Sequence, residues 1–322
     1  MNEPGPERQA VAALVVTFNR KELLQECIAA IVAQDYPVAR IIVIDNASTD
    51  GTADLFNEGG LLAANPIIEY RLMQENLGGA GGFKEGLRIA NLCKVDWVWL
   101  MDDDCIPYPS TLTELVKAAD TLRAKQIDPS FLASAVYGPA NEPMNVPALD
   151  CRSSANGYAD WYTELDSGMA KIESATFVSL LINNSAITQV GLPISSFFIW
   201  GDDTEYTTRL THHYGPAFLV GQSRVLHKRM NAKSLSIMNE DNPKRIANYH
   251  YLYRNNLIVQ RYHHGKGQAT KLLLRDLREA FKCMTSGGGG SLARNARARA
   301  ILAGICEYVT KQYEIEDLGR FL

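Results

Sequence analysis

Three consecutive aspartates, Asp102 to Asp104, end an apolar run that begins at Val95. A buried strand does not tolerate such a cluster in its interior, because adjacent carboxylates repel one another and burial disfavours their charged form. At the carboxyl end of a strand the cluster is stable if a cation lies beside it. Oxygen ligands at this density suit Mg²⁺ or Mn²⁺ bridging to a phosphate. The alternative that the triplet alone leaves open is a solvated acidic turn.

Short apolar runs alternate with helical patterns over the first 125 residues. This alternation is typical of a doubly wound, mostly parallel α/β sheet. Ligands of such sheets bind at the carboxyl ends of the strands, where we expect Thr17, Arg20, Asp45 and the aspartate triplet. The runs and spacings predict strands at 11–17, 40–44, 67–72 and 96–101, and helices at 21–34, 83–93 and 109–125.

The remainder of the chain has two different patterns. Residues 126–175 are rich in Pro, Asn, Ser and Gly, so we expect loops and short antiparallel strands there. From Pro243 onward the apolar spacing is helical, interrupted by a flexible linker, SGGGGS, at 286–291. We predict a domain over 1–240, with halves at about 11–125 and 126–240, and a helical C-terminal region over 241–322. Further strands are expected at 174–183, 197–200 and 217–226.

Charge is unevenly distributed along the chain. Residues 1–243 carry 18 Lys and Arg against 30 Asp and Glu, a net −12, whereas residues 244–322 carry 14 against 6, a net +8. The basic region indicates either an anionic partner, such as a membrane surface, or docking of its helices on the acidic body. If the partner is a membrane, we expect Arg294, Arg297 and Arg299 to contact its headgroups.

The cysteines and the apolar runs bear on the cellular compartment. Six cysteines show no C-x-x-C pair and no metal-ligand spacing, which indicates reduced thiols in a cytosolic protein. The first nine residues lack an apolar signal core, and no apolar run of about 18 residues occurs. We therefore expect a cytoplasmic protein, placed peripherally on the inner face of the cell membrane if the basic region binds lipid. No nucleic-acid partner is expected.

A glycine run, Gly78–Gly82, precedes a predicted helix. Its backbone N–H groups and the helix N-terminus are suited to a diphosphate, although a plain tight turn explains the run equally well. The run is not a P-loop, because no Lys-Ser/Thr pair follows it. It is not a dinucleotide fingerprint either, because it follows the third strand rather than the first.

An aromatic residue, Trp200, precedes the carboxylates Asp202, Asp203 and Glu205. An aromatic side chain beside carboxylates can bind a sugar ring and place a general base near its hydroxyl groups. Capping of a helix over 204–212 by Asp202 or Asp203 is the alternative, and the two roles are compatible. His227, after the strand at 217–226, is either a structural histidine or a metal ligand.

The chain resembles glycosyltransferase family 2, whose members have the GT-A fold. The resemblance covers roughly residues 11–230. Within the family, ENLGGAGGF and W-x-D-D-x-E-Y are most similar to bacterial galactofuranosyltransferases and next to rhamnosyltransferases, and YHYLYRN at 249–255 is similar to a segment of both groups. The motifs, in order, are VVTFNR at 15–20, VIDNASTDGT at 43–52, ENLGGAGGF at 75–83, WLMDDD at 99–104 and WGDDTEY at 200–206.

This resemblance implies a Rossmann-like nucleotide-sugar half, an acceptor half and a role for each motif residue. Asp102, Asp104 and His227 would bind Mn²⁺ or Mg²⁺, and Asp203 would be the general base. Acceptor contacts would come from Trp200, Asp202 and Glu205. The nucleotide-sugar donor would be held by Thr17, Arg20, Asp45, Asn76, Gly78, Gly79, Gly81, Gly82 and Asp103.

Two features differ from the galactofuranosyltransferases. Gly201 separates Trp200 from the acidic pair, and the extra N-terminal β-domain of the polymerising enzymes is not found. Single transfer and polymerisation therefore both stay open, as does the oligomeric state.

The expected function is that of an inverting, metal-dependent glycosyltransferase. The first expected donor is UDP-galactofuranose and the second dTDP-rhamnose, and the expected acceptor is a lipid-linked or cell-envelope glycan. A sugar nucleotidyltransferase is the nearest alternative, but TFNR at 17–20 does not supply its glycine-rich, basic signature. A catalytically silent carbohydrate-binding relative would lack the base or the metal triplet, and both are present. A nicotinamide dehydrogenase is disfavoured by the missing fingerprint.

Overall fold

The computed structural model describes residues 8–60, 62–63, 65–229, 236–286 and 291–315. By its internal contacts the chain divides into two units. Unit 1 comprises Met1–Leu77, Gly82–Leu192 and Thr207–Ala232, and unit 2 comprises Gly78–Gly81, Pro193–Tyr206 and Lys233–Leu322. Two short segments that precede residue 240 thus group with the C-terminal helices. The predicted boundary between 240 and 241 stays a prediction.

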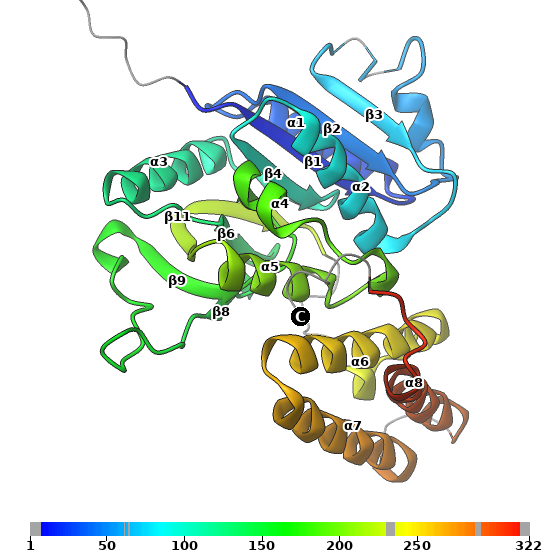
Figure 1. Ribbon diagram of the computed structural model, residues 1–322. Helices are drawn as coiled ribbons and strands as arrows, with labels where there is room; N and C mark the ends of the chain where they lie inside the picture. Colours follow the sequence, from blue (N-terminus) through cyan, green and yellow to red (C-terminus); the bar gives the residue numbers. More distant parts are fainter. Residues whose placement is uncertain (1–7, 61, 64, 230–235, 287–290, 316–322) are drawn as a thin grey trace, which may run out of the picture. The chain divides into compact units, whose positions relative to one another are not determined.

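Unit 1 is built on one mixed sheet, which has 11 strands among the described residues (Figure 1). Its order is β3-β2-β1-β4-β10-β6-β11-β9-β8, with β5 beside β11 and β7 beside β6. The strands β3, β2, β1 and β4 are mutually parallel, as the sequence predicts. The strands are β1 (Val11–Thr17), β2 (Arg40–Asp45), β3 (Ile68–Leu72), β4 (Trp97–Asp102), β5 (Cys105–Pro107), β6 (Phe131–Tyr137), β7 (Pro143–Met144), β8 (Ala148–Leu149), β9 (Met169–Ser174), β10 (Leu180–Asn183) and β11 (Ala217–His227).

Helices cover both faces of this sheet, which is why β1 is buried along its whole length. On one face, α1 (Lys21–Val32) and α3 (Thr111–Ala124) bury their apolar stripes in the main core. On the other face, α2 (Gly78–Leu92) lies so close to β1 that a Cβ added at Gly86 would come within 2.2 Å of Leu14 Cδ1. Also in the unit are α4 (Asn184–Val190), most of α5 (Asp202–His213), and the 3₁₀ turns η1 (Thr52–Leu55) and η2 (Leu165–Ser167).

Strand register aligns the predicted binding residues at one edge of the sheet. Thr17 pairs with Asp45 between β1 and β2, and Val16 pairs with Asp102 between β1 and β4. Because the three strands are parallel, their carboxyl ends lie side by side. The edge that the sequence predicts is therefore formed by the expected strands.

Four local expectations are wrong. The strand expected at 174–183 is not continuous, because β9 ends at Ser174 and β10 begins only at Leu180. Residues 131–137 form a buried central strand, β6, within the region expected to hold loops and short strands. Residues 197–200 are not a strand: the 3₁₀ turn η3 (Ser195–Phe197) is followed by positive φ values at Phe198 and Trp200. The glycine run is not a loop before a helix, because Gly78 already begins α2.

Unit 2 is dominated by α6 (Pro243–His263), α7 (Lys266–Ser286) and α8 (Ser291–Thr310), which pack against one another (Figure 1). Their shared core includes Tyr249, Leu257, Cys283 and Ile301. The short 3₁₀ turn η4 (Ile237–Asn239) precedes α6. The four glycines of the predicted linker, at 287–290, lie outside the described residues. In the described part of the chain, no helix combines the length and apolar character needed to span a membrane.

One of the arginines expected to contact lipid is buried instead. Arg297 is 1% exposed, and its guanidinium donates to the carbonyl of Glu240 and pairs with Asp241 at 2.9 Å. Its predicted contact with headgroups is therefore wrong, and it has an intramolecular role within unit 2. Arg299, by contrast, is exposed.

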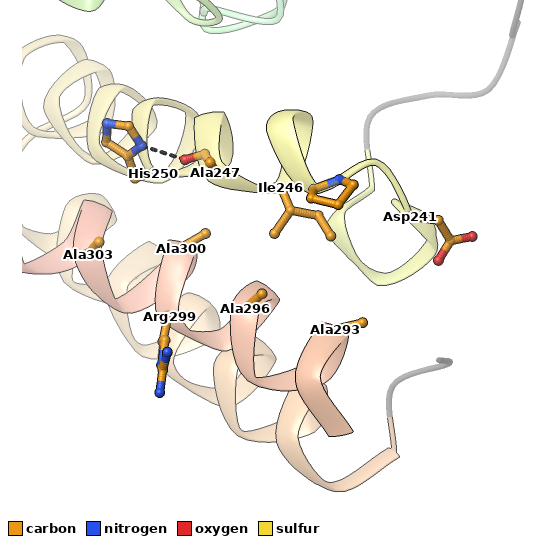
Figure 2. A pocket seen from close by; sticks show the side chains of 10 residues that line it. Asp241, Ile246, Ala247, His250, Ala293, Ala296, Arg299, Ala300 and Ala303 are labelled. Atoms are coloured by element: carbon orange, nitrogen blue, oxygen red, sulfur yellow. Dashed lines mark hydrogen bonds between the residues drawn. The ribbon is translucent and has the colours of Figure 1, made fainter. Parts of the chain in front are cut away.

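A groove of about 640 Å³ lies between α6 and α8 (Figure 2). Its walls are largely methyl groups, with Ala293, Ala296, Ala300 and Ala303 along α8 and Ile246 on α6. On α6, His250 donates through Nδ1 to the carbonyl of Ala247 at 2.7 Å. The described residues that line the groove include no cluster of carboxylates, so the candidate chemistry lies elsewhere.

Candidate active site

The acidic triplet is brought to a histidine by the pairing of β5 with β11. In this antiparallel pair Cys105 lies opposite His227. The imidazole of His227 therefore reaches Asp104, the residue before Cys105. His227 Nε2 lies 3.0 Å from Asp104 Oδ1, and both side chains are almost fully buried. One potential ligand atom each from Asp104, Cys105 and His227 lies within 4.8 Å of the others.

The other nitrogen of His227 indicates what this site is built to hold. Nδ1 donates to Asn145 Oδ1 at 2.9 Å, which orients the ring so that Nε2 points toward Asp104. Asp104 Oδ1 is buried without a hydrogen bond of good geometry. An imidazole nitrogen and a carboxylate oxygen thus face one another 3.0 Å apart, and both atom types can bind a divalent cation. Carboxylate oxygens fit both Mn²⁺ and Mg²⁺, the imidazole nitrogen favours Mn²⁺ of the two, and the Cys105 thiol would favour a softer metal.

Asp103 is tied to β1 and to the loop after it. Thr17 Oγ1 donates to Asp103 Oδ2 at 2.7 Å, and Arg20 Nη1 contacts Asp103 at 3.1 Å and Asp104 at 2.7 Å. Burial raises the pKa of Asp103 to about 6, although Arg20 and Thr17 act to lower it. For Asp104, burial acts to raise the pKa, but His227 and Arg20 outweigh it and the pKa is lowered. Asp102 is partly exposed at the strand end.

Asp45, which we expect to bind the nucleotide, is buried and makes hydrogen bonds that hold the loop after β2. Its Oδ2 accepts from the Tyr70 hydroxyl at 2.7 Å, and its Oδ1 accepts from the Ser48 backbone N–H at 2.8 Å. The Tyr70 ring stacks on Phe56 with ring centroids 4.1 Å apart. Asp45 therefore shapes the loop after β2, and its contact with a nucleotide stays a prediction.

The glycines predicted to hold the donor differ in their surroundings. A Cβ at Gly78, which has φ +71°, would lie 2.0 Å from the carbonyl of Phe198, so this position requires glycine. A Cβ at Gly82 would lie 2.6 Å from Val16 Cγ1 on β1. A Cβ at Gly79, by contrast, would meet no described atom within 4 Å, so this glycine borders open space. The backbone N–H groups of this first helical turn keep their predicted role toward a diphosphate.

The second acidic cluster begins helix α5 in unit 2. Asp202 is 7% exposed, whereas Asp203 is half-buried and accepts from the Thr204 backbone N–H at 2.6 Å. Burial, reinforced by the neighbouring carboxylate, raises the pKa of Asp202 to about 8. Burial also raises the pKa of Asp203, with the Thr204 hydrogen bonds opposing it. Of the two, Asp203 is the more accessible proton acceptor.

Glu205 and Trp200 have partners within unit 2. Glu205 is 1% exposed, and its carboxylate lies 3.3 Å from His263 Nε2 on α6. Glu205 therefore supports the start of α5, and its expected contact with an acceptor stays a prediction. Trp200 is partly buried and packs its ring 4.9 Å, centroid to centroid, from Tyr249.

Sequence reasoning missed the residues that hold the turn before Asp202. Asn255 is fully buried on α6, and its Nδ2 donates to the carbonyls of Phe197 at 2.9 Å and Trp200 at 2.7 Å. Arg254 donates to Asn255 Oδ1 at 3.0 Å and to the Ser196 carbonyl at 2.6 Å. These bonds stabilise a segment with positive φ values. The available signal was the YHYLYRN resemblance, which ends with this pair.

Replacing Asn255 with leucine should lower the free energy of unfolding by about 1–3 kcal/mol, because buried carbonyls lose their donor. Denaturant unfolding monitored by circular dichroism measures the change. The matched control is Asn256→Leu at the neighbouring, half-buried position, which should cost clearly less. Equal stability of Asn255→Leu and the parent would show that the amide does not hold the turn.

The fold of the chain is that of a known enzyme class. The crystal structure of GalNAc-T7 with UDP, GalNAc and Mn²⁺ superposes with a TM-score of 0.60, covering 95% of this chain and 58% of that one, at 13% sequence identity. At this identity the likeness concerns the fold alone. The GT-A architecture expected from the sequence is thereby confirmed, with its C-terminal helices. The sheet is parallel from β3 to β4 and mixed beyond β4, rather than mostly parallel as expected.

Sequence comparison finds relatives of the N-terminal part. Residues 12–149 match the model of Glycosyl transferase family 2. Galactofuranosyltransferase GlfT1 of Mycolicibacterium smegmatis is 30% identical over 213 residues, 63% of this chain and 65% of the relative. GlfT1 of Mycobacterium tuberculosis H37Rv is 30% identical over 206 residues, 63% and 64% of the two chains. Glycosyltransferase AglE of Haloferax volcanii is 24% identical over 205 residues, 62% of this chain and 61% of the relative. The similarity thus spans slightly less than two thirds of each of these curated relatives.

Proposed function

We propose that this protein is an inverting, metal-dependent glycosyltransferase that uses a nucleotide-diphosphate sugar. The observation that carries the proposal is the buried pair of Asp104 Oδ1 and His227 Nε2, 3.0 Å apart at the edge of the sheet. A divalent cation at this position would be bound by both of these atoms. Further support comes from the match to the family 2 model over residues 12–149.

In this proposal, Asp102, Asp104 and His227 hold Mn²⁺ or Mg²⁺. The ion, when bound, offsets the negative charge that develops on the departing diphosphate. Trp200 and Asp202 border the acceptor. The nucleotide side of the site is lined by Thr17, Arg20, Asp45, Asn76, Gly78, Gly79, Gly81, Gly82 and Asp103.

Asp203 is the proposed general base. Its carboxylate takes the proton of an acceptor hydroxyl while that oxygen forms a bond to the anomeric carbon. The bond from this carbon to the diphosphate oxygen breaks on the opposite face, and its electron pair leaves with the nucleoside diphosphate. One displacement inverts the anomeric centre and requires no covalent enzyme intermediate.

UDP-galactofuranose is the donor we propose first, because the curated relatives include galactofuranosyltransferases at 30% identity. dTDP-rhamnose is the second candidate. We propose a lipid-linked or cell-envelope glycan as acceptor, and a cytoplasmic enzyme bound peripherally to an anionic membrane surface. The net charge of +8 over residues 244–322 supports that last point.

A donor panel tests the proposal with the purified protein, Mn²⁺ and each of several nucleotide sugars. Release of nucleoside diphosphate should be fastest with UDP-galactofuranose and should exceed release from UDP-galactopyranose by at least about tenfold, since the site would be shaped for the furanose ring. Preference for dTDP-rhamnose would replace the donor while leaving the reaction class intact. Release from no nucleotide sugar, with or without glycan acceptors, would contradict glycosyl transfer.

A further inference from the structure

Helix α7 exposes an apolar stripe on its outer face. Leu274, Leu277, Phe281 and Met284 are 48%, 39%, 64% and 45% exposed. Their spacing of three, four and three residues places them on one side of the helix. Contiguous apolar side chains of this size on an exposed helix face mark an interaction surface rather than scattered exposure.

Cations border this stripe, and the acids of α7 point the other way. Lys271, Arg275, Arg278 and Lys282 are all exposed, three of them directly following a residue of the stripe. Asp276 is fully buried, and its carboxylate pairs with Arg275 at 3.1 Å. Glu279 is half-buried and hydrogen-bonded to Tyr253 of α6, where it contributes to a raised pKa of the tyrosine. The outer face of α7 is therefore apolar and basic.

We infer that this outer face of α7 is a docking surface for an anionic lipid bilayer. Leucine, phenylalanine and methionine would enter the boundary between headgroups and acyl chains, while lysine and arginine would meet the lipid phosphates. Self-association through the same stripe is disfavoured, because it would bring the basic rims of two copies together and like charges repel. Charge complementarity thus selects an anionic surface.

This inference rests on the proposed peripheral membrane association and names the surface responsible. It moves that surface from α8, where Arg297 is buried, to α7. It does not depend on sugar transfer, because lipid binding is measured without a donor or an acceptor. A protein that binds vesicles but transfers no sugar would overturn the proposed activity alone.

Co-sedimentation with phosphatidylcholine vesicles, with and without phosphatidylglycerol, tests the surface with the full chain. The parent should bind the anionic vesicles and release them in high salt. Lys271→Gln with Arg278→Gln should weaken binding roughly 10- to 30-fold, about what two interfacial cations contribute. Leu277→Ser with Phe281→Ser should weaken it by roughly tenfold or more. Thermal unfolding of each variant confirms that it is folded.

The matched control removes the same number of charges from α8, as Arg294→Gln with Arg299→Gln. It should retain most of the binding. Equal losses from the α7 and α8 variants would overturn the assignment to α7 while leaving peripheral association in place. Absence of parent binding to any vesicle would overturn both. A parent dimer that becomes monomeric in Leu277→Ser with Phe281→Ser would identify a second copy as the partner instead.

Discussion

Asp104→Asn should lower the rate of sugar transfer by on the order of 10³-fold and should strongly weaken Mn²⁺ binding. The substitution keeps the shape of the side chain but removes the charge that faces His227 Nε2. A cation that stabilises the transition state contributes several kcal/mol, which corresponds to a loss of this size. Asp102→Asn should act in the same direction. Initial rates and calorimetric titration with Mn²⁺ measure the two effects separately.

The control for this experiment is Asp35→Asn, at an exposed carboxylate after α1, which should keep the parent rate and the parent affinity for Mn²⁺. His227→Ala supplies a second test on the other side of the proposed site and should also weaken Mn²⁺ binding. Undiminished transfer by the parent in excess chelator would show that the reaction needs no metal. Unchanged Mn²⁺ affinity in both Asp104→Asn and His227→Ala would show that the metal does not bind at this site.

Asp203→Asn is expected to lower the turnover number by about 10²- to 10⁴-fold, the range that general base catalysis supplies. Donor affinity should change little, because the asparagine keeps the volume and the hydrogen bond from Thr204. A lower turnover number with an unchanged KM would indicate loss of the base, whereas a higher KM with an unchanged turnover number would indicate loss of binding. Loss in Asp202→Asn without loss in Asp203→Asn would show that the two roles are reversed.

The pH dependence of transfer follows from the burial of the same carboxylate. Asp203 accepts a proton only when it is ionised, so activity should fall as pH decreases through its pKa. Because burial raises that pKa, the acid limb should lie above the ordinary carboxylate range near about 4. An acid limb at or below pH ~4 would contradict this assignment.

Several features of the molecule follow from local pattern in the sequence. The buried runs of β1, β2 and β4 are continuous and apolar, because a parallel sheet covered on both faces needs such strands. The aspartate triplet marks the carboxyl end of β4, since charge cannot continue into the core. The helical spacing after Pro243 likewise identifies α6, α7 and α8. Each of these signals lies within a few residues of the element that it predicts.

Other features escape local pattern because their partners are far away in the chain. The apolar pattern of strand β6 is weakened by alanine and serine residues. The strand is buried because it pairs with β10 and β11 on its two sides. Positive φ values at Phe198 and Trp200 depend on hydrogen bonds from Asn255, which lies far along the chain on α6. Nothing near Arg297 in the sequence shows that its charge is buried against Asp241.

The sequence by itself thus determined the four parallel strands from β3 to β4, their carboxyl edge and the types of side chain available for chemistry. Only the tertiary structure decided which of them meet. His227 reaches Asp104 through the pairing of β11 with β5, and its ring is oriented by the contact with Asn145. The outward face of α7 became visible only once α6 and α8 had covered the inner one. The physical reason is that apolar periodicity reports burial, whereas contacts between distant residues depend on strand register and helix packing.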